Sequence, residues 1–124
     1  MDSAQLLQRT KIFALLIIKF FQSLPKTEEA RILGKQLLRS GSSVAANYRA
    51  ACRSRSDQEF YSKLCIVVEE VDETQFWFEL IRDSGIIENT QIDNLLKESE
   101  ELLHIFSASR KTVKNRLTNK STNQ

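Results

Sequence analysis

The stretch that decides the fold begins as Arg39-Ser-Gly-Ser-Ser-Val-Ala-Ala-Asn-Tyr-Arg-Ala-Ala-Cys-Arg53, turns at Ser56-Asp-Gln-Glu59 and continues as Val68-Glu-Glu-Val-Asp-Glu-Thr-Gln-Phe-Trp-Phe-Glu-Leu80. Its first part is basic and rich in small residues, whereas its last part is acidic and aromatic. Ser56 and Glu59 have the spacing of a capping box, in which two side chains satisfy the free amides at a helix start. The stretch therefore predicts two helices that pack closely and carry opposite charge.

After the turn, core-facing positions follow one another in steps of four and three residues, as one face of a helix requires. These positions are Phe60, Leu64, Val67, Val71, Thr74, Phe78 and Ile81. The spacing predicts a helix over residues 57–84, with Gly85 as its left-handed C-cap.

Before the turn, a helix is predicted over residues 27–55, and one of its faces is unusually small. That face contains Gly34, Leu38, Gly41, Ala45, Tyr48 and Cys52. A glycine inside a helix costs about 1 kcal/mol relative to alanine, so Gly34 and Gly41 indicate either a close helix contact or a kink at residues 40–43. Asn47 occupies a core-like position, where a polar side chain fixes the register of packing.

The first helix is predicted over residues 3–23 and the fourth over residues 90–117, starting near Asn89 or Thr90. The first has an inward stripe formed by Leu6, Phe13, Ile17, Phe20 and Leu24. A second apolar set covers most of its remaining surface and comprises Ile12, Leu15, Leu16, Ile18 and Phe21. A surface helix needs only one stripe, so the second set predicts a partner, most simply another copy of the chain.

Together these helices predict an all-α, antiparallel up-down-up-down four-helix bundle that assembles into a homo-oligomeric ring. A chain of 124 residues with three glycines and one proline suits one domain with few turns. We expect the domain to span residues 1–117 and residues 118–124 to form a disordered polar tail. The apolar run 12–18 is far shorter than the ~20 residues of a membrane span, and Cys52 and Cys65 are expected to be buried free thiols. Both features favour the cytoplasm and no membrane partner.

The acidic part of the third helix needs compensation, because like charges four residues apart on a helix repel each other. Its clustered acids include Glu69, Glu70 and Glu73. We expect them to pair with the basic second helix, within the subunit or across an interface, with Arg49 and Arg53 as the foremost partners. The neighbouring Trp77 is expected to pack on the face beside the core.

No catalytic or cofactor site is expected. A carboxylate metal site in a bundle would need Glu-x-x-His motifs on two facing helices. His104 is the only histidine, so the single spacing Glu101-x-x-His104 cannot supply both motifs. No phosphate-binding glycine loop and no nucleophile elbow occurs in the sequence. The chemistry therefore indicates a protein without metal, cofactor or enzymatic activity.

Basic residues form two candidate surfaces. Arg31, Lys35 and Arg39 recur every four residues, so they form a cationic ridge that either neutralises phosphates or meets the acidic third helix. A second cluster comprises Arg110, Lys111 and Lys114, whose charges also suit a helix C-terminus.

Residues 34–48, 56–64 and 69–74, together with Trp77, resemble the four-helix-bundle family encoded in intervening sequences of bacterial 23S ribosomal RNA genes. The resemblance spans roughly residues 3–113 and implies a short, cytosolic, non-enzymatic bundle. Where many members have an acid after the Asn-Tyr pair, this chain has Arg49-Ala50-Ala51. The chain also resembles, more distantly, the accessory protein of diversity-generating retroelements, a pentameric barrel that binds nucleic acid and a reverse transcriptase. That resemblance implies a homopentamer that presents basic residues to nucleic acid.

Two functions follow as expectations. In the first, a non-enzymatic homo-oligomer binds RNA or DNA through a cationic surface formed by Arg31, Lys35, Arg39 and Arg53, supplemented by the Arg110 cluster. In the alternative, the bundle is a protein-interaction or scaffold module that docks a nucleic-acid-processing enzyme, and its charges serve subunit contacts.

Overall fold

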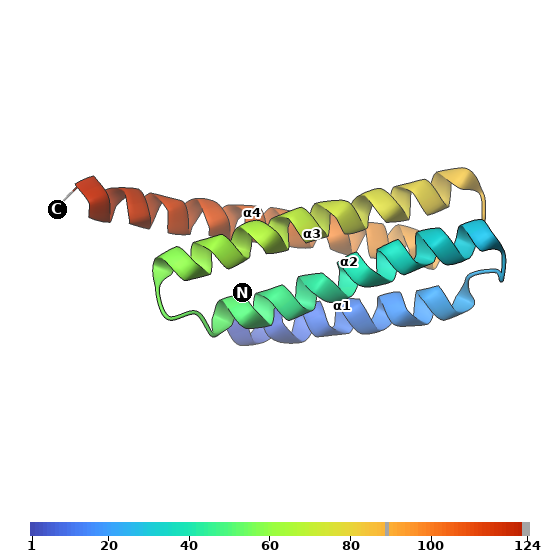
Figure 1. Ribbon diagram of the computed structural model, residues 1–124, viewed down its shortest axis with the longest axis horizontal. Coiled ribbons are helices and arrows are strands. Elements are labelled where there is room, and N and C mark those ends of the chain that lie inside the picture. Colours follow the sequence, from blue (N-terminus) through green and yellow to red (C-terminus); the bar gives the residue numbers. More distant parts are fainter. Residues whose placement is uncertain (89, 123–124) are drawn as a thin grey trace.

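The computed structural model describes residues 1–88 and 90–122. It contains four helices, α1 (Ser3–Ser23), α2 (Glu28–Cys52), α3 (Asp57–Ser84) and α4 (Gln91–Thr122), and no strand occurs within those two ranges. The helices lie along one long axis, and successive helices are joined at opposite ends of the molecule (Figure 1). The predicted all-α class with four helices is confirmed.

Short polar side chains define where the first three helices begin. Asp2 and Gln5 form a capping box, with the Gln5 amide donating to Asp2 Oδ1 at 2.8 Å. The Ala30 amide donates to Thr27 Oγ1 at 3.3 Å, and the Glu59 amide donates to Ser56 Oγ at 3.1 Å. Each bond satisfies an amide that has no partner inside its helix.

The end of α3 agrees with the sequence prediction, whereas the end of α2 departs from it. Gly85 has a φ of +73° and is the left-handed C-cap of α3, as predicted. However, α2 ends at Cys52 instead of residue 55, because the chain has to turn before the cap at Ser56.

The fourth helix is longer than predicted. It begins at Gln91 and runs through residues 118–122, which were expected to belong to a disordered tail. No glycine or proline interrupts this segment, and Lys120 is held by an ion pair to Asp57 on α3 at 3.0 Å. Asn89 and residues 123–124 of the predicted tail lie outside the described residues.

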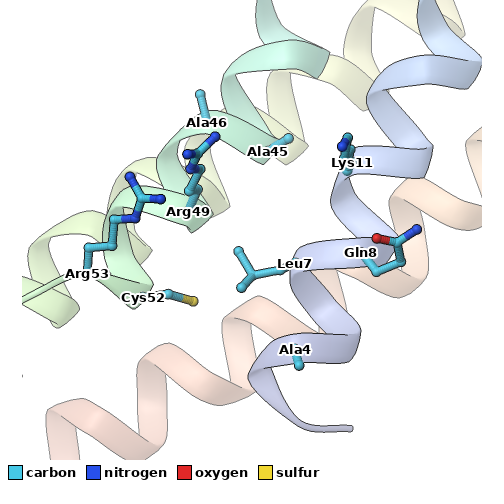
Figure 2. Close-up of a pocket in the computed structure, with 9 residues that line it drawn as sticks. All are labelled: Ala4, Leu7, Gln8, Lys11, Ala45, Ala46, Arg49, Cys52 and Arg53. Atoms are coloured by element: carbon cyan, nitrogen blue, oxygen red, sulfur yellow. The ribbon is translucent and has the colours of Figure 1, made fainter.

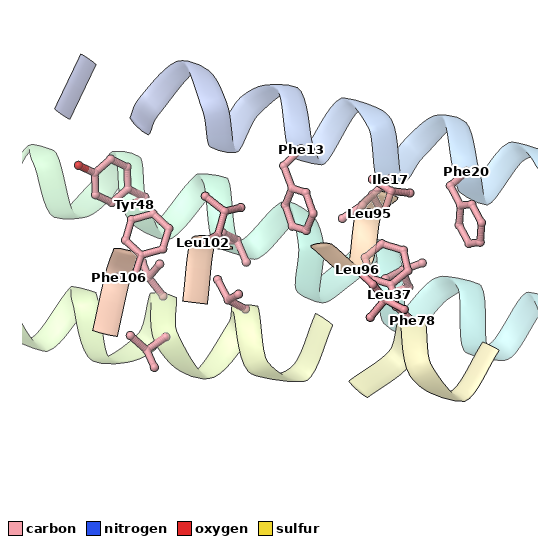
Figure 3. Packing of buried hydrophobic residues seen from close by; sticks show 14 of the residues in the cluster. Phe13, Ile17, Phe20, Leu37, Tyr48, Phe78, Leu95, Leu96, Leu102 and Phe106 are labelled. Carbon is pink, nitrogen blue, oxygen red and sulfur yellow. The ribbon is translucent and has the colours of Figure 1, made fainter. Parts of the chain in front are cut away.

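The core is centred on aromatic rings that meet across the bundle (Figure 3). Phe78 of α3 packs edge-on against Phe13 and Phe20 of α1, with ring centroids 6.4 and 5.8 Å apart. Tyr48 of α2 packs against Phe106 of α4 at 5.0 Å. The backbones of α1 and α3 make no direct contact, so these two helices are diagonal neighbours whose side chains meet in the centre.

Two glycines allow α1 to approach α2 closely. A methyl group at Gly41 would overlap Cδ1 of Ile17, and one at Gly34 would lie 2.7 Å from Cδ1 of Leu24. These distances are shorter than van der Waals contact. Helix α2 runs without interruption through residues 40–43, so the glycines accompany close packing.

The buried polar contact between α2 and α3 is made by a pair of hydroxyls. Thr74 Oγ1 lies 2.9 Å from Ser40 Oγ, and both side chains are fully buried. Asn47, which was expected to fix the register, instead donates to the carbonyl and hydroxyl of Ser43 one turn earlier, at 3.0 and 2.8 Å. The side-chain amide of Asn47 is therefore satisfied within α2, and the polar contact with α3 is made by Ser40 instead.

Several residues lie closer to the surface than a packed core would place them. Trp77 is half-buried, and its ring contacts that of Phe76 at 5.0 Å. Cys52 is exposed and Cys65 half-buried, so the prediction of two buried thiols is wrong. None of the helices, over the described residues, contains an apolar segment long enough to cross a bilayer.

Candidate nucleic-acid interface

Arg39, the last residue of the predicted cationic ridge, is already paired within the chain. Its guanidinium lies 3.4 Å from a carboxylate oxygen of Glu70 and forms a second ion pair with Glu73. Both acids belong to α3, so this cluster joins the middle of α2 to the middle of α3. The predicted pairing between the acidic helix and the basic helix therefore exists within the subunit, but with Arg39 as the cation.

Arg31 and Lys35 lie apart from this cluster, near the connection between α1 and α2. Both are exposed, and neither makes an ion pair within the described part of the chain. They border a small cavity of about 180 Å3 together with Lys26. The predicted ridge is therefore divided. Arg39 is neutralised by acids in the middle of the molecule, whereas Arg31 and Lys35 are unpaired, within the described residues, near the connection between α1 and α2.

A larger cationic groove lies at the opposite end of the bundle, between the start of α1 and the end of α2. Its volume is about 590 Å3. Figure 2 shows Arg49 and Arg53 on one side of the groove and Lys11 on the other. Small and apolar side chains complete much of the lining, namely Ala4, Leu7, Ala45 and Ala46.

The charged side chains that line this groove are all cationic. No acid lines it, and Lys11, Arg49 and Arg53 make no ion pair within residues 1–88 and 90–122. Arg49 and Arg53 are four residues apart on one helical face, where like charges repel by a few tenths of a kcal/mol. The negative end of the α2 dipole compensates only part of this charge. The groove is therefore a concentrated positive site.

The position of Arg49 and Arg53 explains why they do not pair with the acidic cluster. Helices α2 and α3 are joined by the short turn before Ser56, so residues close to that turn on α2 lie level with the start of α3. The acids lie farther along α3, level with Arg39. Glu69, the remaining acid of the predicted set, is exposed and makes no ion pair in the described ranges.

Tyr48 and Cys52 lie one turn apart on α2, and of the two only Cys52 lines the groove. Tyr48 is buried, and burial raises the pKa of its hydroxyl above the ordinary value of 10.0, with a smaller contribution from the adjacent Cys52 thiol. The phenol therefore stays protonated over the physiological range and adds no negative charge. The sulfur of Cys52 points into the groove (Figure 2).

The predicted cluster on α4 lies at the same end of the molecule as the groove. Lys111 and Lys114 are exposed and Arg110 is half-buried, and none of the three has an ion pair among the described residues. Farther along, Arg116 and Lys120 bind Asp57 at 3.4 and 3.0 Å. The structure therefore gathers Arg53 and the α4 cluster at one end, on different sides of the bundle, while Arg31 and Lys35 lie at the other.

One ion-pair cluster, between α1 and α4, was missed by sequence reasoning. Arg9 of α1 binds Glu98 of α4 with nitrogen–oxygen distances of 2.8 and 2.6 Å, and Glu101 lies 3.1 Å away. The hydrogen bonds that Arg9 donates to Glu98 raise the pKa of Arg9 above its ordinary value. The spacing of Glu98 and Glu101 on one face of α4 was the available signal.

Within the described residues, no three His, Cys, Asp or Glu side chains are grouped as metal ligands.

Four helices around a single apolar core, with a cationic groove at one end, define a small helical-bundle protein. The sequence matches the model of the 23S rRNA-intervening sequence protein family over residues 2–108, and the chain belongs to this family, as the resemblance indicated.

A solved structure with the same fold comes from Bacteroides thetaiotaomicron. It is a protein of unknown function from the S23 ribosomal protein family, with 29% sequence identity and a TM-score of 0.82. The similarity covers 90% of this chain and 99% of that chain. No curated protein matches the chain.

Proposed function

We propose that this chain is a non-enzymatic, cytoplasmic, homo-oligomeric protein that binds RNA or DNA through cations at one end of an up-down-up-down bundle. The observation that carries the proposal is the groove between α1 and α2. Three cations from two helices border it, no acid lines it, and none of the three is paired within the described residues.

The chemistry of the groove suits phosphodiester groups. An arginine guanidinium can donate two parallel hydrogen bonds to phosphate oxygens, and two arginines one turn apart can serve neighbouring phosphates. A volume of about 590 Å3 lies within the range of about 300–1,000 Å3 that is usual for ligand sites. The small side chains of Ala45 and Ala46 leave room for a backbone to approach.

The proposal changes the ranking of the candidate residues. Arg53 remains, joined by Lys11 and Arg49, and the Arg110, Lys111 and Lys114 cluster offers a second contact at the same end. Arg39 is given less weight because two carboxylates already neutralise it.

The test measures binding of a labelled structured RNA and a DNA duplex across a salt series. The double variant Arg49→Gln/Arg53→Gln should reduce the slope of log affinity against log salt by about two, because each lost phosphate contact removes about one. The matched control is Arg31→Gln/Lys35→Gln, which removes the same charge from the other end and should retain most of the slope. Equal reductions of the slope in both variants would mean that nucleic acid responds to the overall positive charge and not to the groove. If neither nucleic acid binds at low salt, the proposal is wrong.

A second candidate function is a protein-interaction module, and exposed apolar residues on α1 favour it. Ile12, Leu15, Leu16 and Ile18 are 36–52% exposed. In this version the bundle, as a ring such as a homopentamer, docks a nucleic-acid-processing enzyme. Loss of the groove cations would then leave partner binding unchanged.

A further inference from the structure

We infer that the outer surface of α1 in one copy docks on the outer surface of α3 in a second copy. The inference rests on the proposed homo-oligomer and identifies which surfaces would form its contact. The α1 face comprises Lys11, Ile12, Leu15, Ile18 and Lys19. The α3 face comprises Ile66, Glu69, Asp72, Phe76 and Leu80.

The α1 face is apolar at its centre and basic at its edges. Leu15 is 52% exposed and Ile12 45% exposed. Lys11 and Lys19 stand four residues before and after Leu15, so they lie on the same side of the helix. Residues 3–23 contain no acid. Lys11 also borders the groove, so in the assembled protein it would face the carboxylates of the second copy, and Arg49 and Arg53 are the groove cations that stay available to phosphate.

The α3 face has the same plan with the opposite charge. Phe76 is 51% exposed, and Leu80, one turn later, is 38% exposed. Asp72 stands one turn before Phe76 and Glu69 two turns before it, which places both acids on the same side of α3. Neither acid makes an ion pair within the described ranges.

Charge decides which surfaces meet. Two α1 faces would bring lysines together, and two α3 faces would bring carboxylates together, which costs free energy without compensating contacts. An α1 face against an α3 face places lysines beside carboxylates around an apolar centre. Each of these charged side chains lacks an ion-pair partner in the described part of its own chain.

The fold prevents one chain from satisfying both faces by itself. Helices α1 and α3 are diagonal in the bundle, since Phe13 and Phe78 meet in its centre while the two backbones make no contact. Their outer surfaces therefore point away from each other. A contact between unlike surfaces is heterologous, and its repetition gives a closed ring or an open filament.

The test uses one chemical change at three exposed positions. Leu15→Glu damages the α1 face and Phe76→Glu damages the α3 face. Ile32→Glu is the matched control, because Ile32 is 55% exposed on α2 and belongs to neither face. Mass in solution is measured by light scattering, and circular dichroism verifies that each variant keeps its helix content.

We expect the unmodified protein and Ile32→Glu to have the same oligomeric mass, and the other two variants to be monomers when alone. Mixed in equal amounts, the two monomers should form a heterodimer and nothing larger, because each supplies one intact face. An oligomer that survives either face variant, or a mixture that stays monomeric, would overturn the inference.

The outcomes separate this inference from the proposed function. A monomeric unmodified protein would overturn both the homo-oligomer and the contact, whereas an oligomer resistant to the face variants would overturn the contact alone. Nucleic-acid binding is measured on the same variants, and neither Leu15 nor Phe76 lines the groove. Binding can therefore fail while the mixing result holds, or persist while the mixing result fails.

Discussion

The middle and the end of α2 present arginines in contrasting surroundings. Arg39 lies against two carboxylates of α3, whereas Arg49 and Arg53 border a groove without any acid. All three belong to one basic segment and look equivalent in the sequence. The difference shows that an arginine on α2 is available to a ligand only where the neighbouring helix has no acid beside it. The number of charges nearby does not decide it.

The largest expected effect comes from giving the groove arginines, Arg49 and Arg53, a carboxylate partner within the chain. Ala46 is exposed, lines the groove and stands three residues before Arg49 on the same helical face. Ala46→Glu would supply a carboxylate to the groove arginines, and we expect nucleic-acid affinity to fall about tenfold, since phosphate contacts lose their counterion release. Ala46→Gln has nearly the same shape without the charge and serves as the control. Similar losses from both would attribute the effect to bulk, and the comparison between the two regions would lose its electrostatic basis.

A smaller effect is expected from the converse change, which removes the paired cation. Arg39→Gln should lower the free energy of unfolding by at most about 1 kcal/mol, because Arg39 and Glu73 are 51% and 40% exposed and such pairs are screened by water. Urea unfolding at low and high salt measures it, and high salt should shrink the difference. Arg49→Gln is the matched variant and should change stability by no more than a few tenths of a kcal/mol. If both substitutions destabilise equally, Arg39 has no special contact.

The smallest effect concerns Asp57, which pairs with α4 at the same end as the groove. The hydrogen bond from Lys120 lowers the pKa of Asp57 below its ordinary value of 3.8, and the charge of Arg116 adds to this. Because the folded-state pKa is the lower one, the stabilisation is complete above that ordinary value and is lost as the pH falls through the lowered pKa. Asp57→Asn should speed amide hydrogen exchange over residues 116–120 near neutral pH, and the protection factors of the two proteins should converge as the pH falls below 3.8. Unchanged exchange in that segment would mean that the pair does not hold the last turns of α4.

The fold could be predicted because helical periodicity is a local property. The inward stripe of α1, from Leu6 to Leu24, is buried as its spacing indicated, and the caps at Ser56 and Gly85 lie where their residue types placed them. The length of α4 was underestimated because polar residues were equated with disorder, although nothing in that segment breaks a helix.

The site was less predictable because it depends on how each helix is rotated about its axis and on the axial register between neighbouring helices. Ser40 faces α3 and Asn47 turns back to its own helix, a difference of side-chain direction that heptad position alone does not specify. Arg9 finds a partner 89 residues away on α4. Such pairings follow from the tertiary arrangement, which residue spacing within one helix does not contain.

The fit between Gly41 and Ile17 has a consequence for how related sequences can diverge. A methyl group at Gly41 would overlap the terminal carbon of Ile17, while the other Ile17 carbons would lie 3.4 and 3.5 Å from it, at the edge of ordinary contact. Replacing Ile17 by valine removes only that terminal carbon, so alanine becomes acceptable at position 41 once valine occupies position 17. Alanine at position 41 alone would overlap Ile17, and valine at position 17 alone would leave a small void between α1 and α2. The two positions should therefore covary, glycine with isoleucine and alanine with valine, and an evolving lineage would move between these states most easily through the valine intermediate.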